Sequence, residues 1–159
     1  MEEWKVIPNS KFEISSCGNM RRIGTTTNYK LSLDGGGYYI YPIEYNDFRK
    51  TKRIHRLVGE VFIPNPDNLP QLDHINGKRD DNRIENLRWC SRSQNQHNKG
   101  LQKNNKSGFK GVRCSDGRWR ATIWNEGKYN HIGCYDTAEE AFDAYKNKAA
   151  ELHGIFAKA

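Results

Sequence analysis

Residues 73–95 read DHINGKRDDNRIENLRWCSRSQN, and the rest of the chain is organised around this stretch. An acidic residue stands directly before a histidine at Asp73-His74, Asn86 follows twelve positions after the histidine, and Asn95 follows nine positions later. Carboxylate and amide oxygens suit a hard metal ion, and an imidazole suits proton transfer near neutral pH. The spacing therefore predicts metal-binding and general-base side chains around one compact unit.

The pattern around these residues predicts the order strand, long loop, strand, helix. A short strand is expected to end at residues 73–74, and the Asn-Gly pair at 76–77 is a strong turn signal. After a polar loop, alternation of apolar and polar residues predicts a second strand from about residue 86. Ser91 as N-cap and Gly100 as C′ residue would bound a helix that carries Asn95.

This stretch resembles the ββα-metal motif of HNH endonucleases, most closely that of the phage intron-encoded homing endonucleases. The resemblance implies that His74 is the general base, that Asp73 and Asn95 are metal ligands, and that Asn86 holds the loop and orients His74. The three motif letters are H-N-N here, without the final histidine of the family name, and His97 is the alternative third residue. A helix turns about 100° per residue, so His97 points roughly 200° away from Asn95 and cannot serve the same site in the same register.

Phosphodiester hydrolysis needs a base that deprotonates water and a cation that offsets charge on the phosphoryl and leaving oxygens. One carboxylate and one carboxamide form a hard, oxygen-only ligand set, which favours one Mg²⁺ or Mn²⁺ ion over zinc. Neighbouring residues of a regular strand face opposite ways, so Asp73 and His74 can share a site only where the strand ends or distorts. The alternative is a polar, turn-rich hairpin with a surface histidine.

The composition indicates small polar modules with a polyanionic partner. The 159 residues are 35% hydrophobic, and the net charge is +7, which suits DNA but on charge alone also suits RNA or a membrane surface. No stretch approaches the ~20 apolar residues of a membrane span, and the N-terminus MEEWKV is too acidic and polar for a signal peptide. We expect a cytoplasmic protein of a bacterial or phage-infected cell, without a membrane partner. The four cysteines form no C-x-x-C pair, so neither a zinc knuckle nor a disulfide framework is indicated.

The expected fold class is α+β, built from small modules. The predicted modules are an N-terminal β-rich unit at 1–45, the ββα-metal nuclease module at 46–98, a linker at 99–106, and a three-stranded sheet packed on one helix at 107–159.

The N-terminal segment resembles the module often found ahead of the nuclease motif in homing endonucleases, where a tryptophan, E-I-S and G-x-x-R-R recur. Trp4, Val6, Phe12 and Ile14 are expected to anchor its small β unit. The arginine pair at 21–22 either contacts phosphate or lies at a solvated strand end.

A basic segment leads into the nuclease motif. Five Lys or Arg residues and no acidic residue occur between 49 and 56. From Ile54 onward the apolar residues follow helical spacing, and the run I-H-R-L-V-G-E-V-F resembles the segment that precedes the motif in this family. We expect this helix to brace the catalytic hairpin, with His55 packing there instead of catalysing.

The last segment predicts three short strands over 107–113, 117–124 and 128–133, with turns at 116–117 and 126–127. A helix should follow from Thr137, where Thr137 and Glu140 form a capping box, and should end at Gly154. On the second strand, alternation places residues 119, 121 and 123 on one face, suited to the helix, and leaves the other face for DNA.

Charge supports this assignment, because residues 102–133 carry seven Lys or Arg against two acidic residues, whereas 134–159 carry three against five. The runs G-V-R, G-R-W and G-C-Y-D-T-A-E-E-A-F-D-A-Y resemble the plant Apetala and ethylene-response DNA-binding domain. That domain reads the major groove with its sheet; the alternative is a small protein-binding β3α module. The residues expected to contact DNA are Arg113, Arg118, Arg120, Thr122, Trp124, Lys128, Tyr129 and His131.

Together these features predict a monomeric, metal-dependent endonuclease whose partner is double-stranded DNA. Only one set of the four motif residues is present in the sequence, which predicts a nick as the elementary product. The alternatives are a non-catalytic DNA-binding regulator with a degenerate motif and an RNA-directed nuclease.

Overall fold

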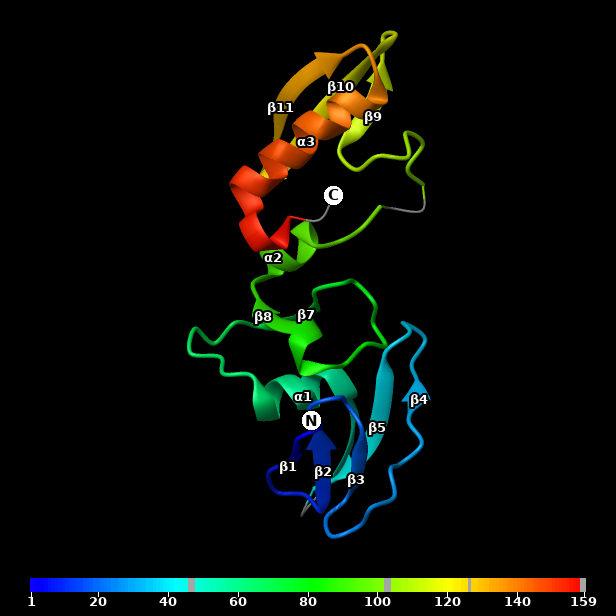
Figure 1. Cartoon of the computed structure of the whole chain (residues 1–159), viewed down its shortest axis with the longest axis vertical. Helices are drawn as coiled ribbons and strands as arrows, with labels where there is room; N and C mark the ends of the chain where they lie inside the picture. Colours follow the sequence, from blue (N-terminus) through cyan, green and yellow to red (C-terminus); the bar gives the residue numbers. More distant parts are fainter. Residues whose placement is uncertain (46–47, 102–103, 126, 158–159) are drawn as a thin grey trace. The chain divides into compact units, whose positions relative to one another are not determined.

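The computed structural model describes residues 1–45, 48–101, 104–125 and 127–157 (Figure 1). The chain forms two compact units, Met1–Arg92 and Ser93–Ala159, and each has its own hydrophobic core. The structure combines small antiparallel sheets with a few helices, which confirms the predicted α+β class. None of the helices in the described ranges has the length and apolar character needed to cross a membrane.

The first unit contains two three-stranded sheets, one helix and a hairpin. The first sheet has the order β1-β2-β3 and the second β4-β5-β6. Helix α1, Ile54–Phe62, directly follows β6. The remaining elements are β1 Trp4–Val6, β2 Phe12–Ser15, β3 Met20–Arg22, β4 Ser32–Leu33, β5 Tyr39–Glu44, β6 Arg49–Arg53, β7 Gln71–His74, the 3-10 helix η1 Ile84–Asn86 and β8 Leu87–Cys90.

Helix α1 lies between the N-terminal sheet and the β7–β8 hairpin, and it contacts both (Figure 1). Its buried side contributes Ile54, Leu57 and Val58 to a core that also holds Ile14 of β2 and Leu72 of β7. This single core includes residues on both sides of the predicted 45/46 boundary, so the division into separate modules there stays a prediction.

One predicted N-terminal anchor is wrong. Val6 is 50% exposed, and the next residue, Ile7, is buried in its place. Phe12 and Ile14 are buried as expected, whereas Trp4 is only partly covered. The reason is alternation, because neighbouring residues on an extended chain point to opposite sides.

Helix α2, Arg92–His97, has its first residue in the first unit and the rest in the second. It ends before Gly100, where the sequence placed its end. The second unit continues with a sheet of order β11-β10-β9. Its strands are β9 Val112–Ser115, β10 Arg118–Asn125 and β11 Lys128–Tyr135. Helix α3, Ala138–His153, lies along this sheet and leads into the 3-10 helix η2, Gly154–Phe156 (Figure 1).

The predicted capping box of α3 is present. The Glu140 amide donates to Thr137 Oγ1 at 3.2 Å, and the Thr137 amide donates to Glu140 Oε2 at 3.4 Å. Gly154 follows the last helical residue, as expected. The Asp116-Gly117 turn also forms, with positive φ at both residues, as a two-residue hairpin loop of type I′ requires.

The first strand of this unit begins later than predicted, at Val112 instead of 107. Side chains here take backbone carbonyls that a strand would use for hydrogen bonds to its neighbour. Ser107 Oγ donates to the Val112 carbonyl at 2.7 Å, and Asn105 Nδ2 donates to the Phe109 carbonyl at 3.0 Å. These bonds hold a loop where the sequence suggested a strand. Within the predicted linker, residues 102–103 lie outside the described residues, as does residue 126 of the predicted 126–127 turn.

Gly59 sets how closely α1 approaches the hairpin. A Cβ atom at this position would lie 2.7 Å and 2.9 Å from the two δ-carbons of Leu72 and 3.3 Å from Trp89. Glycine to alanine in a helix gains about 1 kcal/mol, whereas overpacking a core costs about 1–3 kcal/mol. Because Leu72 is buried and has little space to move, we expect the clash to exceed the gain.

We therefore predict that Gly59→Ala lowers the free energy of unfolding by about 1 kcal/mol, measured by urea denaturation. Leu72→Ala, which removes the clashing carbons, should cost less in the Gly59→Ala background than in the wild-type chain. Strictly additive effects of the two substitutions would show that Gly59 and Leu72 do not limit this packing.

Candidate active site and nucleic-acid surface

The β7–β8 hairpin separates the two adjacent motif residues. In its antiparallel register Asp73 pairs with Arg88 and His74 pairs with Leu87, so alternation places Asp73 and His74 on opposite faces. His74 is the last residue of β7, and it shares the core-facing side with Leu72. The register is regular through both residues, so β7 does not bring Asp73 and His74 to one face, and their sharing of a site stays a prediction.

Asp73 lies against Arg88 on its face of the hairpin. Its Oδ2 atom accepts hydrogen bonds from Nε and Nη2 of Arg88 at 3.1 Å and 3.0 Å, and both side chains are largely buried. The guanidinium offsets the desolvation of a buried carboxylate.

Asn86 closes the loop that connects the two strands. Its Oδ1 atom accepts from the Asn76 amide at 3.0 Å, and its Nδ2 atom donates to the Asp81 carbonyl at 2.8 Å. The Asn86 carbonyl in turn accepts from the Ile75 amide at 2.8 Å. The side chain is buried and bonds both sides of the loop, whereas its predicted role in orienting His74 stays a prediction.

Asn82 is the residue that contacts the His74 ring within this loop. Nε2 of His74 lies 3.2 Å from Oδ1 of Asn82, and both side chains are buried. In the sequence Asn82 is one of several polar residues of this loop. No local signal distinguishes it from the other polar residues of the loop, because its role depends on how the loop folds back over β7.

The N-terminal sheet supports Asn82 from the other side. Gly18, in the turn between β2 and β3, has φ +82°, and a Cβ atom there would lie only 2.7 Å from Cβ of Asn82. The Ile84 amide donates to the Ser16 carbonyl at 2.8 Å, which joins the same turn to the end of the loop. The turn and the loop can pack this closely only because residue 18 lacks a side chain.

Two further rings lie against His74. The ring centroid of His55, in the first turn of α1, lies 4.9 Å away in an edge-on arrangement, and that of Tyr38 lies 5.9 Å away. Tyr38 and His55 also contact each other, at 5.0 Å. His55 packs in this cluster, as the sequence suggested, whereas Tyr38 carried no signal.

Burial lowers the pKa of both histidines. The pKa of His55 falls to about 3, chiefly through burial and secondarily through the nearby His74. Among the described residues no partner bonds the buried Nδ1 atom of His55. The pKa of His74 is also lowered by burial, with the Asn82 hydrogen bond acting in the opposite direction. Both rings are therefore neutral at pH 7.

Two arginines bracket Tyr38 beside this cluster. The guanidinium carbon of Arg53 lies 4.2 Å from the ring centroid and that of Arg79 lies 5.2 Å from it. Arg53 forms an ion pair with Asp34 at 2.7 Å, and Arg79 donates to the Gly36 carbonyl at 2.7 Å. Positive charge therefore lies next to the His74 ring cluster.

Arg21, one of two arginines considered for phosphate contact, is already engaged within its sheet. It forms an ion pair with Glu13 at 2.8 Å, and its guanidinium lies over the Trp4 ring at 3.9 Å. Its neighbour Arg22 is exposed at the end of β3.

The predicted ligands fit a hard cation by their chemistry. Asp73 offers a carboxylate and Asn95 a carboxamide oxygen, which are ligand types that a hard cation prefers. In the described ranges, no group of three or more His, Cys, Asp or Glu side chains is arranged to hold a metal ion. Asp73 belongs to the first unit, whereas Asn95 lies on α2 in the part that belongs to the second unit.

His97, the alternative third motif residue, packs within the second unit. Its ring stacks on His153 at the end of α3, with the centroids 3.6 Å apart. Burial lowers the pKa of both rings, and the Lys110 ammonium donates to the His97 carbonyl at 2.7 Å.

The sheet of the second unit divides its two faces as the alternation predicts. Trp119, Ala121 and Ile123 pack toward α3. The strand register places seven of the eight predicted DNA-contacting residues on the opposite face; these are Arg113, Arg118, Arg120, Thr122, Trp124, Tyr129 and His131. Lys128 is exposed at the hairpin end, where alternation directs it away from the side that carries Tyr129.

Cross-strand pairing brings these seven residues close together. Arg120 lies opposite Arg113, and Trp124 lies opposite Tyr129, with ring centroids 4.7 Å apart. Nε of Arg120 is buried and has no hydrogen-bond partner among the described residues. Arg118 forms an exposed ion pair with Asp136 at 3.1 Å. The face is therefore basic and aromatic.

Comparison with known proteins places the motif in a family. The family model described as HNH endonuclease matches residues 52–97. Over 99 residues the chain is 40% identical to an uncharacterized HNH endonuclease of Acanthamoeba polyphaga mimivirus, which covers 59% of this chain and 25% of that protein. The chain thus spans only about a quarter of that relative.

Two phage proteins are similar over more of their own length. Protein 3.8 of Escherichia phage T7 is 35% identical over 117 residues, covering 72% of this chain and 95% of that protein. The DNA endonuclease I-HmuI of Bacillus phage SP01 is 29% identical over 98 residues, covering 60% of this chain and 56% of that protein.

A solved structure shares the fold. The structure titled "DNA binding and cleavage by the HNH homing endonuclease I-HmuI" superposes with a TM-score of 0.55, covering 95% of this chain and 91% of that chain at 22% identity. The family match over 52–97, together with the relatives named as HNH endonucleases, shows that this chain contains an HNH endonuclease domain.

Proposed function

We propose that the chain is a metal-dependent DNA endonuclease in which His74 is the general base. The observation that carries this proposal is the contact between Nε2 of His74 and Oδ1 of Asn82 at 3.2 Å. An amide oxygen only accepts hydrogen bonds, so Nε2 carries the proton and Nδ1 keeps its lone pair. A neutral imidazole with a fixed tautomer can take a proton from water.

Asp73 and Asn95 are the residues that we propose to hold one Mg²⁺ or Mn²⁺ ion. When bound, such an ion offsets charge on the phosphoryl oxygens and on the leaving oxygen. Arg53 and Arg79 are placed to attract the phosphate toward the His74 cluster, because both lie against Tyr38. Attack of water on phosphorus with cleavage of the bond to the 3′ oxygen would leave a 5′-phosphate and a 3′-hydroxyl, as the family resemblance implies.

The second unit is proposed to bind double-stranded DNA as the plant Apetala domain does, with the sheet face opposite α3. Support comes from the pairing of Arg113 with Arg120 and of Trp124 with Tyr129 on that face. A monomer with a single motif would attack one phosphate at a time. The proposed elementary product is therefore a nick.

The first test replaces the proposed base. His74→Ala should lower the cleavage rate by about 10²–10⁴-fold and leave DNA affinity nearly unchanged, because base catalysis contributes that much. Supercoiled plasmid with Mg²⁺ should pass through open circles before linear molecules appear, and EDTA should stop the reaction. His97→Ala is the control and should still cut. DNA binding without cleavage by the wild-type chain would favour the non-catalytic regulator.

A second test concerns the support of Asn82. Gly18→Ala should lower the cleavage rate by about 10²-fold, because its Cβ atom displaces Asn82 and with it the His74 ring. Gly24→Ala is the matched control, since Gly24 has a similar φ of +80° but no atom within 4 Å of the added carbon. Equal single-turnover rates for the two variants would show that Gly18 does not support the position of Asn82 and His74.

The third test is the dependence of cleavage on pH. Burial lowers the pKa of His74 below its ordinary 6.5, so the base form persists and the single-turnover rate should fall only below pH 6.5. A rate that already falls between pH 8 and pH 7 would contradict this assignment.

Circular dichroism at each pH is the control for unfolding. Because the pKa of buried His55 is about 3, the folded state binds fewer protons than the unfolded state below pH 6.5. Stability is therefore complete above pH 6.5 and declines as the pH falls toward 3. Rates should be compared only where the fold is intact.

A further inference from the structure

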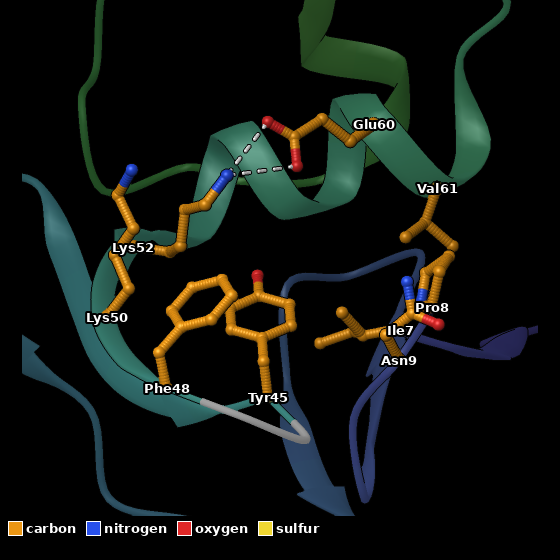
Figure 2. A pocket seen from close by; sticks show the side chains of 9 residues that line it. All are labelled: Ile7, Pro8, Asn9, Tyr45, Phe48, Lys50, Lys52, Glu60 and Val61. Atoms are coloured by element: carbon orange, nitrogen blue, oxygen red, sulfur yellow. Dashed lines mark hydrogen bonds and ion pairs between the residues drawn. The ribbon is translucent and has the colours of Figure 1, made fainter.

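The first unit contains a pocket that the proposed catalytic site does not use. It has a volume of about 660 Å³ and lies between the β5–β6 strands, helix α1 and the segment after β1 (Figure 2). None of the four motif residues lines it. Its volume is within the range of small-molecule sites.

One wall of this pocket is aromatic. The rings of Tyr45 and Phe48 stack with centroids 5.0 Å apart and an interplanar angle of 24°. Phe48 is 60% exposed, so much of its ring is accessible from the solvent. Figure 2 shows the two rings side by side, with Ile7 beyond Tyr45.

The opposite wall is charged. Lys52 of β6 and Glu60 of α1 span the pocket above the rings in Figure 2, with Nζ 3.4 Å from each carboxylate oxygen. This distance is longer than the ~2.7–2.9 Å of a strong charge-assisted bond, so both groups keep capacity for another partner. Lys50 lies at the same end of the pocket, on the same side of β6 as Lys52.

These walls fit one chemical class of ligand. A flat ring can stack on Phe48, while Lys52 and Glu60 offer a donor and an acceptor to the polar edge of the ring. A phosphate would be repelled by Glu60 but attracted by Lys50. The positive charge of Lys50 and Lys52 comes from the basic run at 49–56. Of that run, only Arg53 has a role in the proposed catalytic site.

We propose that this pocket binds one unpaired nucleotide of a DNA strand, with its base on Phe48 and its phosphate beside Lys50. That the strand is DNA rests on the endonuclease function proposed above. A concave pocket with one stacking wall takes a single base, and it cannot take a base pair within a helix. The site would therefore hold a strand where the duplex is opened or has an unpaired end.

The experiment compares two single strands with the same charge. One is an oligothymidylate of about 12 nucleotides, and the other is an abasic phosphodiester chain of the same length. Affinities of the full chain are measured by fluorescence anisotropy in EDTA, so that no cleavage occurs. We expect Phe48→Ala to reduce the preference for the strand with bases by roughly 5- to 150-fold, the range for one stacked base.

Matched variants separate stacking from other effects. Phe48→Trp should keep the preference, whereas Phe48→Leu, which is apolar but has no π-face, should lose it. Leu33→Ala is the surface control, because Leu33 is similarly exposed at 57% and lies outside the pocket. Lys50→Gln should weaken both strands equally and reduce the dependence of affinity on salt.

Full retention of the wild-type preference by Phe48→Ala would overturn the proposal, as would equal binding of the two strands by the wild-type chain. Either result would leave the assignment of His74 untouched, because that rests on cleavage with Mg²⁺. Conversely, loss of base preference in Phe48→Ala would support the pocket even if no DNA were cut.

Discussion

The two hydrogen bonds of the Asn86 carboxamide are the constraint on which the site depends. They join the Asn76 amide to the Asp81 carbonyl through one buried side chain. Ile84 packs against the core at the end of this loop, whereas Ile75 is exposed and the residues between them are polar or glycine, so the conformation of that stretch rests on such bonds. Once closed, the loop brings Asn82 to Nε2 of His74.

The N-terminal sheet completes this arrangement from outside the motif. The turn at Gly18 packs against Asn82, and Ser16 accepts a hydrogen bond from Ile84. Ile14 and Met20 share the core with α1, so the same sheet supports the turn and the helix. The residues ahead of the motif therefore belong to the structural support of the site, whatever else they bind.

Helix α1 joins the proposed chemistry to a second surface. Its first turn presents His55 to His74, and its last turns line the pocket with Glu60 and Val61. Strand β6 behaves similarly, because Arg53 lies beside Tyr38 while Lys50 and Lys52 line the pocket on the opposite side. Because side chains alternate along a strand, this short basic segment contributes residues both to the His74 ring cluster and to the pocket.

The sequence alone determined the fold class, the hairpin with its following helix, the α3 capping box and the division of β10 into two faces. Each depends on spacing, turn residues or alternation, which are local. Only the tertiary structure decided that Asn82 contacts His74, that position 18 has no room for a side chain, that the Tyr38 ring lies against His74, and that Val6 is exposed. These outcomes depend on which segments pack together. A contact between residues 18 and 82 leaves no periodic trace in the sequence, because it is made by the shape of two turns meeting in the folded chain.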